Sequence, residues 1–275
     1  MNSYEKKGYL STHFKLFHIA DRQDKKFQFH YHDFYKIVFF LKGNVTYCVE
    51  GKTYDLSPYD IVLVGKDEIH RPIVDQDTEY ERIVLYLSQS FLNMSLFLSD
   101  AFKVAKEQHV SVMRLSAGDF TKVYGLLKEA EEILKAGEYA CDGFAGLKIS
   151  ETLMVLGRSA RLNGPGYLGN VRFNRKIIEV CEFINSHLSE DLTVDMLSSR
   201  FYESKYNFMR RFKECTGYSI HKYILEKRLL YTEKLVSEGD KVTFACIKAG
   251  FSNYSTYLRA KKRAESVKEK NQTDI

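Results

Sequence analysis

The order of apolar and polar positions divides the chain into an extended front half and a helical rear half. Between residues 10 and 90, short runs of β-branched or aromatic residues alternate with turn signals such as Lys42-Gly43-Asn44. Runs of this length and spacing predict strands. The predicted strands cover residues 10–19, 35–41, 45–49, 61–64 and 82–87. Strands so closely spaced are typical of a small antiparallel barrel or sandwich.

From about residue 89 the periodicity becomes helical. Apolar residues recur at helical spacing between 120 and 134, after a favourable N-cap at Ser116. A second predicted helix covers 144–161, and we expect both helices to pack on the barrel. The second helix ends at the turn sequence Asn163-Gly164-Pro165-Gly166. Residues 163–171 are therefore the predicted linker between a front domain, 1–162, and an all-α rear domain, 172–275.

The rear domain begins with a helix predicted at 174–185, followed by two short helices within 192–217. Thr193 is a favourable N-cap for the first of these. In the second, Phe208 and Phe212 lie one turn apart and form an apolar inner face, while the outer face is basic and polar. This arrangement predicts a helix-turn-helix whose second helix enters the major groove of DNA.

A second copy of the pattern supports this prediction. Residues 241–263 repeat it, with Arg259 aligned on Arg210, 49 positions earlier, and a long helix capped by Ser219 is predicted between the two copies. The chain thereby resembles the C-terminal DNA-binding domain of the AraC/XylS family of transcription regulators. The matching motifs are LT-x-x-x-L at 192–197, S-x-x-x-x-x-R-x-FK at 204–213, TG-x-S at 216–219 and GFSN at 250–253.

By this resemblance, the outer faces of the two second helices contact double-stranded DNA. The side chains implied to contact bases are Tyr206, Met209, Arg210, Tyr254, Ser255, Thr256 and Arg259. Lys205, Lys213 and Lys262 are expected on phosphates, and Asn207 lies on the same outer face. An arginine can donate two hydrogen bonds to guanine, whereas a phosphate contact carries no sequence information.

The second unit departs from the family pattern. Lys261 occupies the position that Phe212 holds in the first unit, where a buried aromatic ring is expected. A lysine at such a position must extend to solvent or lose its charge, so we expect the second recognition helix to be the less stable one. Residues 264–275 are polar and do not resemble the closing helix of the family, so we expect them to be frayed.

The front domain contains a motif of a different kind. His30 and His32 are two residues apart, so on a strand their side chains would share one face. With Pro58-Tyr59-Asp60 and His70-Arg71-Pro72 downstream, the pattern resembles the two motifs of cupin barrels. Regulators of the AraC family often carry a cupin-like sensor ahead of the DNA-binding domain. The expected fold is therefore a two-domain α+β chain with an N-terminal cupin-like barrel.

The cupin resemblance implies a candidate ligand set. In metal-binding cupins the ligands would be His30, His32, His70 and a glutamate, but Lys36 stands at the glutamate position. A lysine is a poor ligand for a divalent cation and repels it. We therefore expect no metal or cofactor, with the three histidines as the candidate ligands should one bind. The favoured interpretation is a site for a small polar effector, such as a sugar, lined by His30, His32, Tyr35, Tyr47 and His70. Histidines with no ligand at all are the other alternative.

The distribution of charge and the composition indicate which partners to expect. From Val171 onward there are 20 Lys and Arg against 14 Asp and Glu, whereas residues 1–170 are almost neutral, so a polyanion is expected to bind the rear domain only. The start of the chain lacks signal-peptide features and no long apolar run occurs, so we expect a cytoplasmic protein without a membrane partner. Five scattered cysteines without a C-x-x-C motif indicate reduced thiols. The family resemblance adds a homodimer and RNA polymerase as partners.

Three functions remain open from the sequence. The favoured one is an effector-controlled, sequence-specific transcription regulator without enzymatic activity. The alternative is a metal-dependent cupin enzyme, an isomerase or dioxygenase, with an accessory helical domain; Lys36 counts against it. The third is a front domain that only dimerises and binds no ligand.

Overall fold

The computed structural model describes residues 5–6, 10–22, 27, 29–75, 78–164, 166, 171–173 and 175–269. Contacts between residues divide the chain into two compact units, a front unit formed mainly by residues 7–171 and a rear unit formed mainly by residues 172–275. Much of the predicted linker, 163–171, lies outside the described residues, so its role as a linker stays a prediction.

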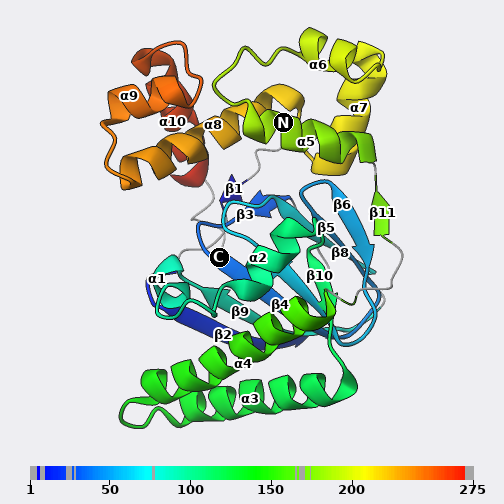
Figure 1. Cartoon of the computed structure of the whole chain (residues 1–275), viewed down its shortest axis with the longest axis vertical. Helices are drawn as coiled ribbons and strands as arrows, with labels where there is room; N and C mark the ends of the chain where they lie inside the picture. Colours follow the sequence, from blue (N-terminus) through cyan, green and yellow to red (C-terminus); the bar gives the residue numbers. More distant parts are fainter. Residues whose placement is uncertain are drawn as a thin grey trace. The chain divides into compact units, whose positions relative to one another are not determined.

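The front unit is built on antiparallel strands that form two sheets (Figure 1). One sheet contains the strand order β3-β8-β5-β6, and the other has the order β10-β7-β4-β9-β2. Their bounds are β2 Phe14–Asp21, β3 His30–Tyr31, β4 Tyr35–Lys42, β5 Val45–Val49, β6 Lys52–Asp55, β7 Asp60–Val64, β8 His70–Val74, β9 Tyr80–Leu87 and β10 Val112–Arg114. Two further short strands are β1 Glu5–Lys6 and β11 Val171–Phe173.

Alternation along β4 separates two apolar cores. Ile37 and Phe39 belong to the core that the helices cover, whereas Val38 and Phe40 belong to the core between the sheets. The inner core also contains Val45, Tyr47 and Val49 of β5. The interior of the barrel is therefore lined by the even-numbered residues of β4.

Four helices complete the front unit: α1 Gln89–Leu92, α2 Asp100–Glu107, α3 Ala117–Ala136 and α4 Cys141–Asn163. As predicted, Ser116 caps α3, and its hydroxyl accepts a hydrogen bond from the Asp119 amide at 3.1 Å. The helices α3 and α4 lie side by side and pack on the sheet that contains β4 (Figure 1). Val123 and Leu127 of α3 and Ile149 of α4 are fully buried there.

The rear unit consists of six helices in its described part: α5 Arg175–Ser186, α6 Val194–Arg200, α7 Lys205–Thr216, α8 Ile220–Ser237, α9 Val242–Lys248 and α10 Tyr254–Glu269. The pairs α6–α7 and α9–α10 are the two helix-turn-helix units, and α8 joins them (Figure 1). The Thr193 hydroxyl caps α6, as predicted, by accepting a hydrogen bond from the Met196 amide at 3.1 Å.

The two units differ in their cores. Phe208 and Phe212 of α7 are buried, and Phe212 meets Tyr223 of α8 edge to face. In α10 the buried positions are Tyr257 and Ala260. Lys261 is only half-buried, and its ammonium lies 6.0 Å from the centre of the Tyr257 ring. The lysine therefore extends along the aromatic surface toward solvent. Of the two alternatives for a lysine at this position, extending to solvent or losing its charge, the structure has the first.

The helix α10 continues to Glu269, so residues 264–269 are helical; the rest of the segment that we expected to be frayed, 270–275, lies outside the described residues. Within the described part of the chain, every helix is too short or too polar to span a membrane.

Candidate functional site

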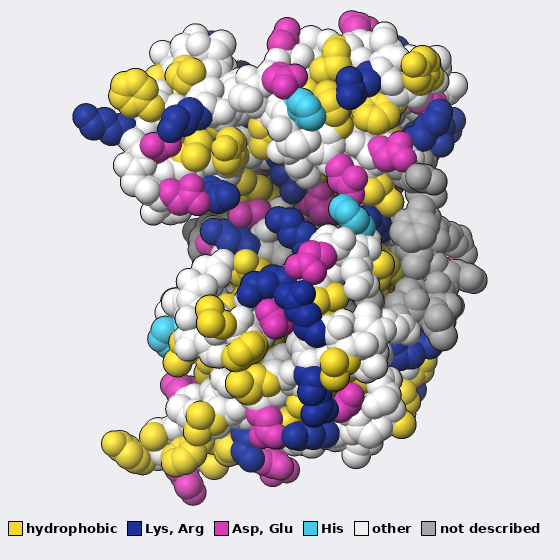
Figure 2. Space-filling view, in the orientation of Figure 1, with side chains coloured by type: hydrophobic (Ala, Val, Ile, Leu, Met, Phe, Trp, Pro, Cys, Tyr) yellow, Lys and Arg dark blue, Asp and Glu magenta, His cyan; other side chains and the backbone are white. Residues whose placement is uncertain are grey.

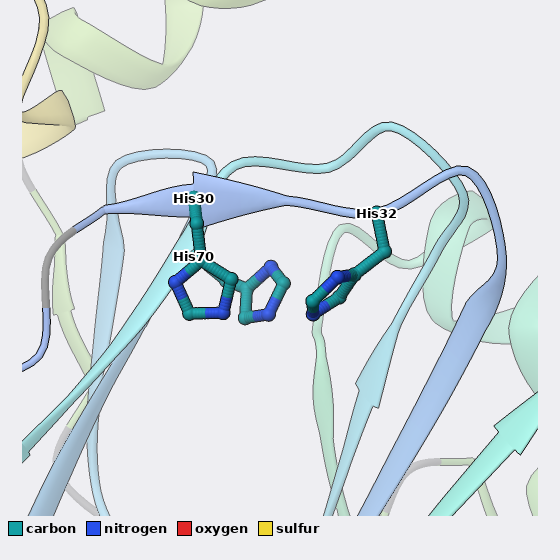
Figure 3. Close-up of side chains that lie close together, drawn as sticks. All are labelled: His30, His32 and His70. Atoms are coloured by element: carbon teal, nitrogen blue, oxygen red, sulfur yellow. The ribbon is translucent and has the colours of Figure 1, made fainter. Parts of the chain in front are cut away.

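The histidines of the front unit converge. His30 is paired directly with His70 across β3 and β8, and His32 follows two residues after His30 (Figure 3). The ring centres of His30 and His70 are 4.4 Å apart, and each lies 5.0 Å from that of His32. All three side chains are buried, and their nitrogens lie within 4.8 Å of one another. We call this set the histidine trio.

The protonation of His70 follows from its contacts. Its Nδ1 lies 2.9 Å from the backbone carbonyl oxygen of Glu68, so Nδ1 carries the proton and donates it. Burial, then the neighbouring His30, Lys36 and His32, hold the pKa of His70 well below its ordinary value. The ring is neutral, and its Nε2 presents a lone pair. This atom is buried and has no hydrogen-bond partner among the described residues.

Tyr47 extends the polar surface inside the barrel. Its ring stacks parallel to that of His70, with centres 6.2 Å apart. The side chain is fully buried, and its hydroxyl likewise finds no hydrogen-bond partner in the described part of the chain. Leaving a buried polar group unpaired costs about 1–3 kcal/mol. Both atoms, on neighbouring stacked rings, are therefore available to hydrogen-bond a ligand or water.

Two cationic side chains also face the interior. Lys36 is buried on the inner face of β4, and burial, followed by repulsion from Arg82, lowers its pKa to about 7. No ion pair joins Lys36 to another described residue. Arg82 of β9 is buried as well, but it is neutralised by Asp21, with Nη2 and Oδ2 3.3 Å apart, and it donates to the Tyr80 carbonyl at 2.8 Å.

The grouping of Tyr35 with the histidines was wrong. Its neighbour Lys36 lies on the inner face of β4, so Tyr35 lies on the other one, where it packs against the helix-covered core. Its ring contacts Phe102 edge to face, and its hydroxyl donates to Gln89 at 2.9 Å. The structure thus brings together His30, His32, His70 and Tyr47 but not Tyr35.

Sequence reasoning missed Arg82 and Tyr86 of β9. The Tyr86 ring lies 5.8 Å from that of His32 and 4.6 Å from that of Phe34. The strand predicted at 82–87 contained the signal, because residues 82, 84 and 86 share one face of a strand.

On the rear unit, the outer face of α7 is open to solvent. Tyr206 is 72% exposed and Met209 40%, and Asn207, Arg210 and Lys213 are exposed too. Among the described residues, the Arg210 guanidinium forms an ion pair with Glu214, one turn along the same helix, at 3.4 Å. The neighbouring Lys205 is held by Asp195 of α6 at 2.8 Å.

The corresponding face of α10 is exposed at Tyr254, Ser255, Arg259 and Lys262, whereas Thr256 is half-buried. Asn253 of the GFSN motif, which the sequence analysis gave no role, caps α10: its side-chain oxygen accepts a hydrogen bond from the Thr256 amide at 2.8 Å. Over the helices of the rear unit, basic and acidic side chains are interspersed on the face shown in Figure 2.

Two curated proteins that resemble this chain are named as transcriptional regulators. Residues 13–134 match the family described as AraC-like ligand binding domain. The uncharacterized HTH-type transcriptional regulator YbfI of Bacillus subtilis is 24% identical over 234 residues, which cover 84% of this chain and 81% of YbfI. The probable transcriptional regulator LumQ of Photobacterium leiognathi is 24% identical over 245 residues, covering 87% and 89%.

Among solved structures, ToxT from Vibrio cholerae with a bound unsaturated fatty acid is similar at a TM-score of 0.39 and 14% identity, over 94% of either chain. The front unit matches a ligand-binding domain, YbfI is named as a helix-turn-helix regulator and LumQ as a probable transcriptional regulator, and the rear unit holds two helix-turn-helix units. Residues 13–134 are therefore similar to the AraC-like ligand binding domain family, and the chain as a whole is similar to transcription regulators.

Proposed function

We propose that this transcription regulator binds a small polar effector at His30, His32, His70 and Tyr47, and that the effector changes its affinity for DNA. The observation that carries this proposal is the pair of buried, unpartnered polar atoms, Nε2 of His70 and the hydroxyl of Tyr47. Such atoms are ordinarily satisfied, so a ligand that bonds to both would relieve their cost. Hydroxyl-rich molecules such as sugars fit this mixture of a donor and an acceptor.

DNA is the proposed partner of the exposed faces of α7 and α10. Arg210 supports this assignment because its side chain is 55% exposed and its ion pair with Glu214 lies on the surface. Exposed pairs of this kind contribute little, so the guanidinium can exchange Glu214 for a guanine at small cost. Lys213 and Lys262 are exposed beside the recognition positions and are proposed to contact phosphates.

Self-association is a further part of the proposal. Phe144, Leu147 and Met154 are 58%, 67% and 46% exposed and lie on the outer side of α4. Such an apolar surface supports a homodimer. We also propose RNA polymerase as a partner, the cytoplasm as the location, and no enzymatic activity, in keeping with relatives that are named as regulators.

The test uses the full chain. A DNA site is first selected from a random pool, and small polar metabolites are then screened for those that shift the unfolding temperature. A hit should change the DNA affinity of the wild type. In the His30→Ala/His32→Ala double variant the response should be lost while binding without effector persists. A hit that acts equally on both proteins would place the effector elsewhere.

A further inference from the structure

We propose that the histidine trio binds one divalent transition-metal ion, zinc before others, inside the barrel. This inference deepens the proposed function, because it names an ion that the same side chains would hold. It goes against the expectation from the sequence, which weighed Lys36 against a metal. The structure supplies three facts that the sequence lacked: the convergence of the rings, their burial and the tautomer of His70.

The first argument is geometric. Three imidazoles from two paired strands place their nitrogens within 4.8 Å of one another. A tetrahedral zinc ion at about 2.0–2.1 Å from each nitrogen needs them roughly 3.4 Å apart. The three rings lie next to one another (Figure 3), so rotation of the rings about their side-chain bonds is the movement that would close this difference.

The second argument concerns which nitrogen is available. Histidine ligands of metals usually donate their other ring N–H to a carbonyl or carboxylate, which fixes the tautomer. His70 already has this arrangement: Nδ1 donates to the Glu68 carbonyl at 2.9 Å, and Nε2 is buried and unpartnered among the described residues. The His70 side chain is fully buried, and buried polar atoms are usually hydrogen-bonded, so an unpaired Nε2 is unexpected for a histidine that serves packing alone.

The third argument selects the ion. The cluster offers nitrogen donors only, which suit zinc, nickel, copper and iron and exclude the oxygen-seeking magnesium and calcium. Three protein nitrogens leave a tetrahedral ion one open position, into which the effector or water can enter. Lys36 opposes the ion, so the affinity is lower than that of a site with a carboxylate. Arg82 adds little to this opposition because Asp21 neutralises it.

The experiment uses the full chain after removal of metals by a chelator. Cobalt(II) is titrated first, because its visible absorption reports tetrahedral nitrogen coordination, and zinc is then added in competition. We expect one equivalent of either ion per chain. His70→Ala should weaken binding by roughly a hundredfold or more, since even the loss of a partner that orients a ligand costs about 10–100-fold.

His32→Gln provides a second variant should His70→Ala fail to fold, and it should also lose stoichiometric binding. The matched control is His13→Ala, which removes an exposed imidazole that contacts Ser90 at 3.3 Å and should leave binding unchanged. Binding well below one equivalent in the wild type, or equal binding in a folded trio variant, would overturn the inference.

DNA affinity measured on the same samples separates the two proposals. Stoichiometric zinc binding without an effect on DNA affinity would support the metal site and count against its regulatory role. An effector response that persists in metal-free protein would overturn the metal site as part of regulation and leave the proposed function standing.

Discussion

The guanidinium of Arg228 donates a hydrogen bond from Nε to the backbone carbonyl oxygen of Leu188 at 2.9 Å. This contact ties the middle of α8 to the loop after α5, and Gly250 of the GFSN motif packs directly on it. A Cβ added at Gly250 would lie 1.9 Å from the Leu188 oxygen and 2.7 Å from Arg228 Nε. Glycine is required here for space as well as for its φ of +94°.

We therefore expect Gly250→Ala to destabilise the rear unit by roughly 3 kcal/mol or more, through the clash and the left-handed backbone together. Gly239→Ala is the matched control, because Gly239 has a φ of +104° but no atom within 4 Å of the added Cβ. Urea unfolding followed by circular dichroism gives both values. Equal losses in the two variants would show that the close approach costs nothing.

Arg210 and Arg211 are adjacent in sequence but differ in surroundings. Arg211 is held by Glu203 at 2.6 Å, and Glu203 also contacts Lys176 of α5, whereas Arg210 faces solvent. Arg210→Ala should cost about 1–3 kcal/mol of specific binding and relax the preference at one base position. Arg211→Ala should instead lower stability by about 1 kcal/mol with base preference unchanged. Sequencing of DNA selected by each variant decides between the two; the same base profile for Arg210→Ala as for the wild type would contradict the assignment.

The buried Lys36 makes stability depend on pH. Its pKa is about 7 in the folded chain against an ordinary value of 10.5, so between these values the unfolded chain binds more protons. Stability should therefore rise as pH increases from 7 toward 10.5. Lys36→Met removes the charge and should be more stable than the wild type at pH 7 by on the order of 3 kcal/mol, with the difference shrinking at higher pH.

The comparison is made on metal-free protein by urea unfolding at pH 7 and pH 9.5. Lys66→Met serves as the control because Lys66 is exposed. If the wild type lost stability relative to Lys36→Met between pH 7 and pH 9.5, the ammonium of Lys36 would not be desolvated in the folded chain.

Lys261 limits the second helix-turn-helix. Lys261 is half-buried, with its ammonium 6.0 Å from the centre of the Tyr257 ring, at the position where the first unit has the fully buried Phe212. Lys261→Phe should raise the stability of the rear unit by about 1 kcal/mol and tighten specific binding. In the wild type, amide hydrogens of 254–263 should exchange faster than those of 205–213. Equal protection of the two helices would refute the idea.

Periodicity was sufficient for the longer elements of the fold. The strand at 45–49 and the helices that became α3, α4 and α5 lie within a few residues of their predicted bounds. The short strands β3, β6 and β8 were missed. The two residues of β3 are too few to show a period, and Pro72 within β8 is a signal against a strand. Their existence depends on pairing with distant partners, such as His30 with His70, which local patterns do not encode.

The candidate site was predictable only in part. The i, i+2 spacing placed His30 and His32 on one face, but His70 joined them only through the resemblance to cupins. Tyr35 was misplaced because the inner face of β4 contains residue 36 and not 35. Along a strand, neighbouring side chains point to opposite faces, so an error of one residue exchanges the two faces. The orphaned Nε2 of His70 depends on the Glu68 carbonyl, a backbone atom that no residue pattern reveals.

The helix α8, 18 residues long, joins the two helix-turn-helix units. At about 1.5 Å per residue it spans roughly 27 Å, somewhat less than the ~34 Å of one turn of B-DNA. Because a continuous helix is stiff, the two halves of a binding site should be phased at about ten base pairs, on the same side of the duplex. An insertion of about five base pairs between them would turn one half away from its recognition helix, whereas the sequence of the intervening bases would matter far less than their number.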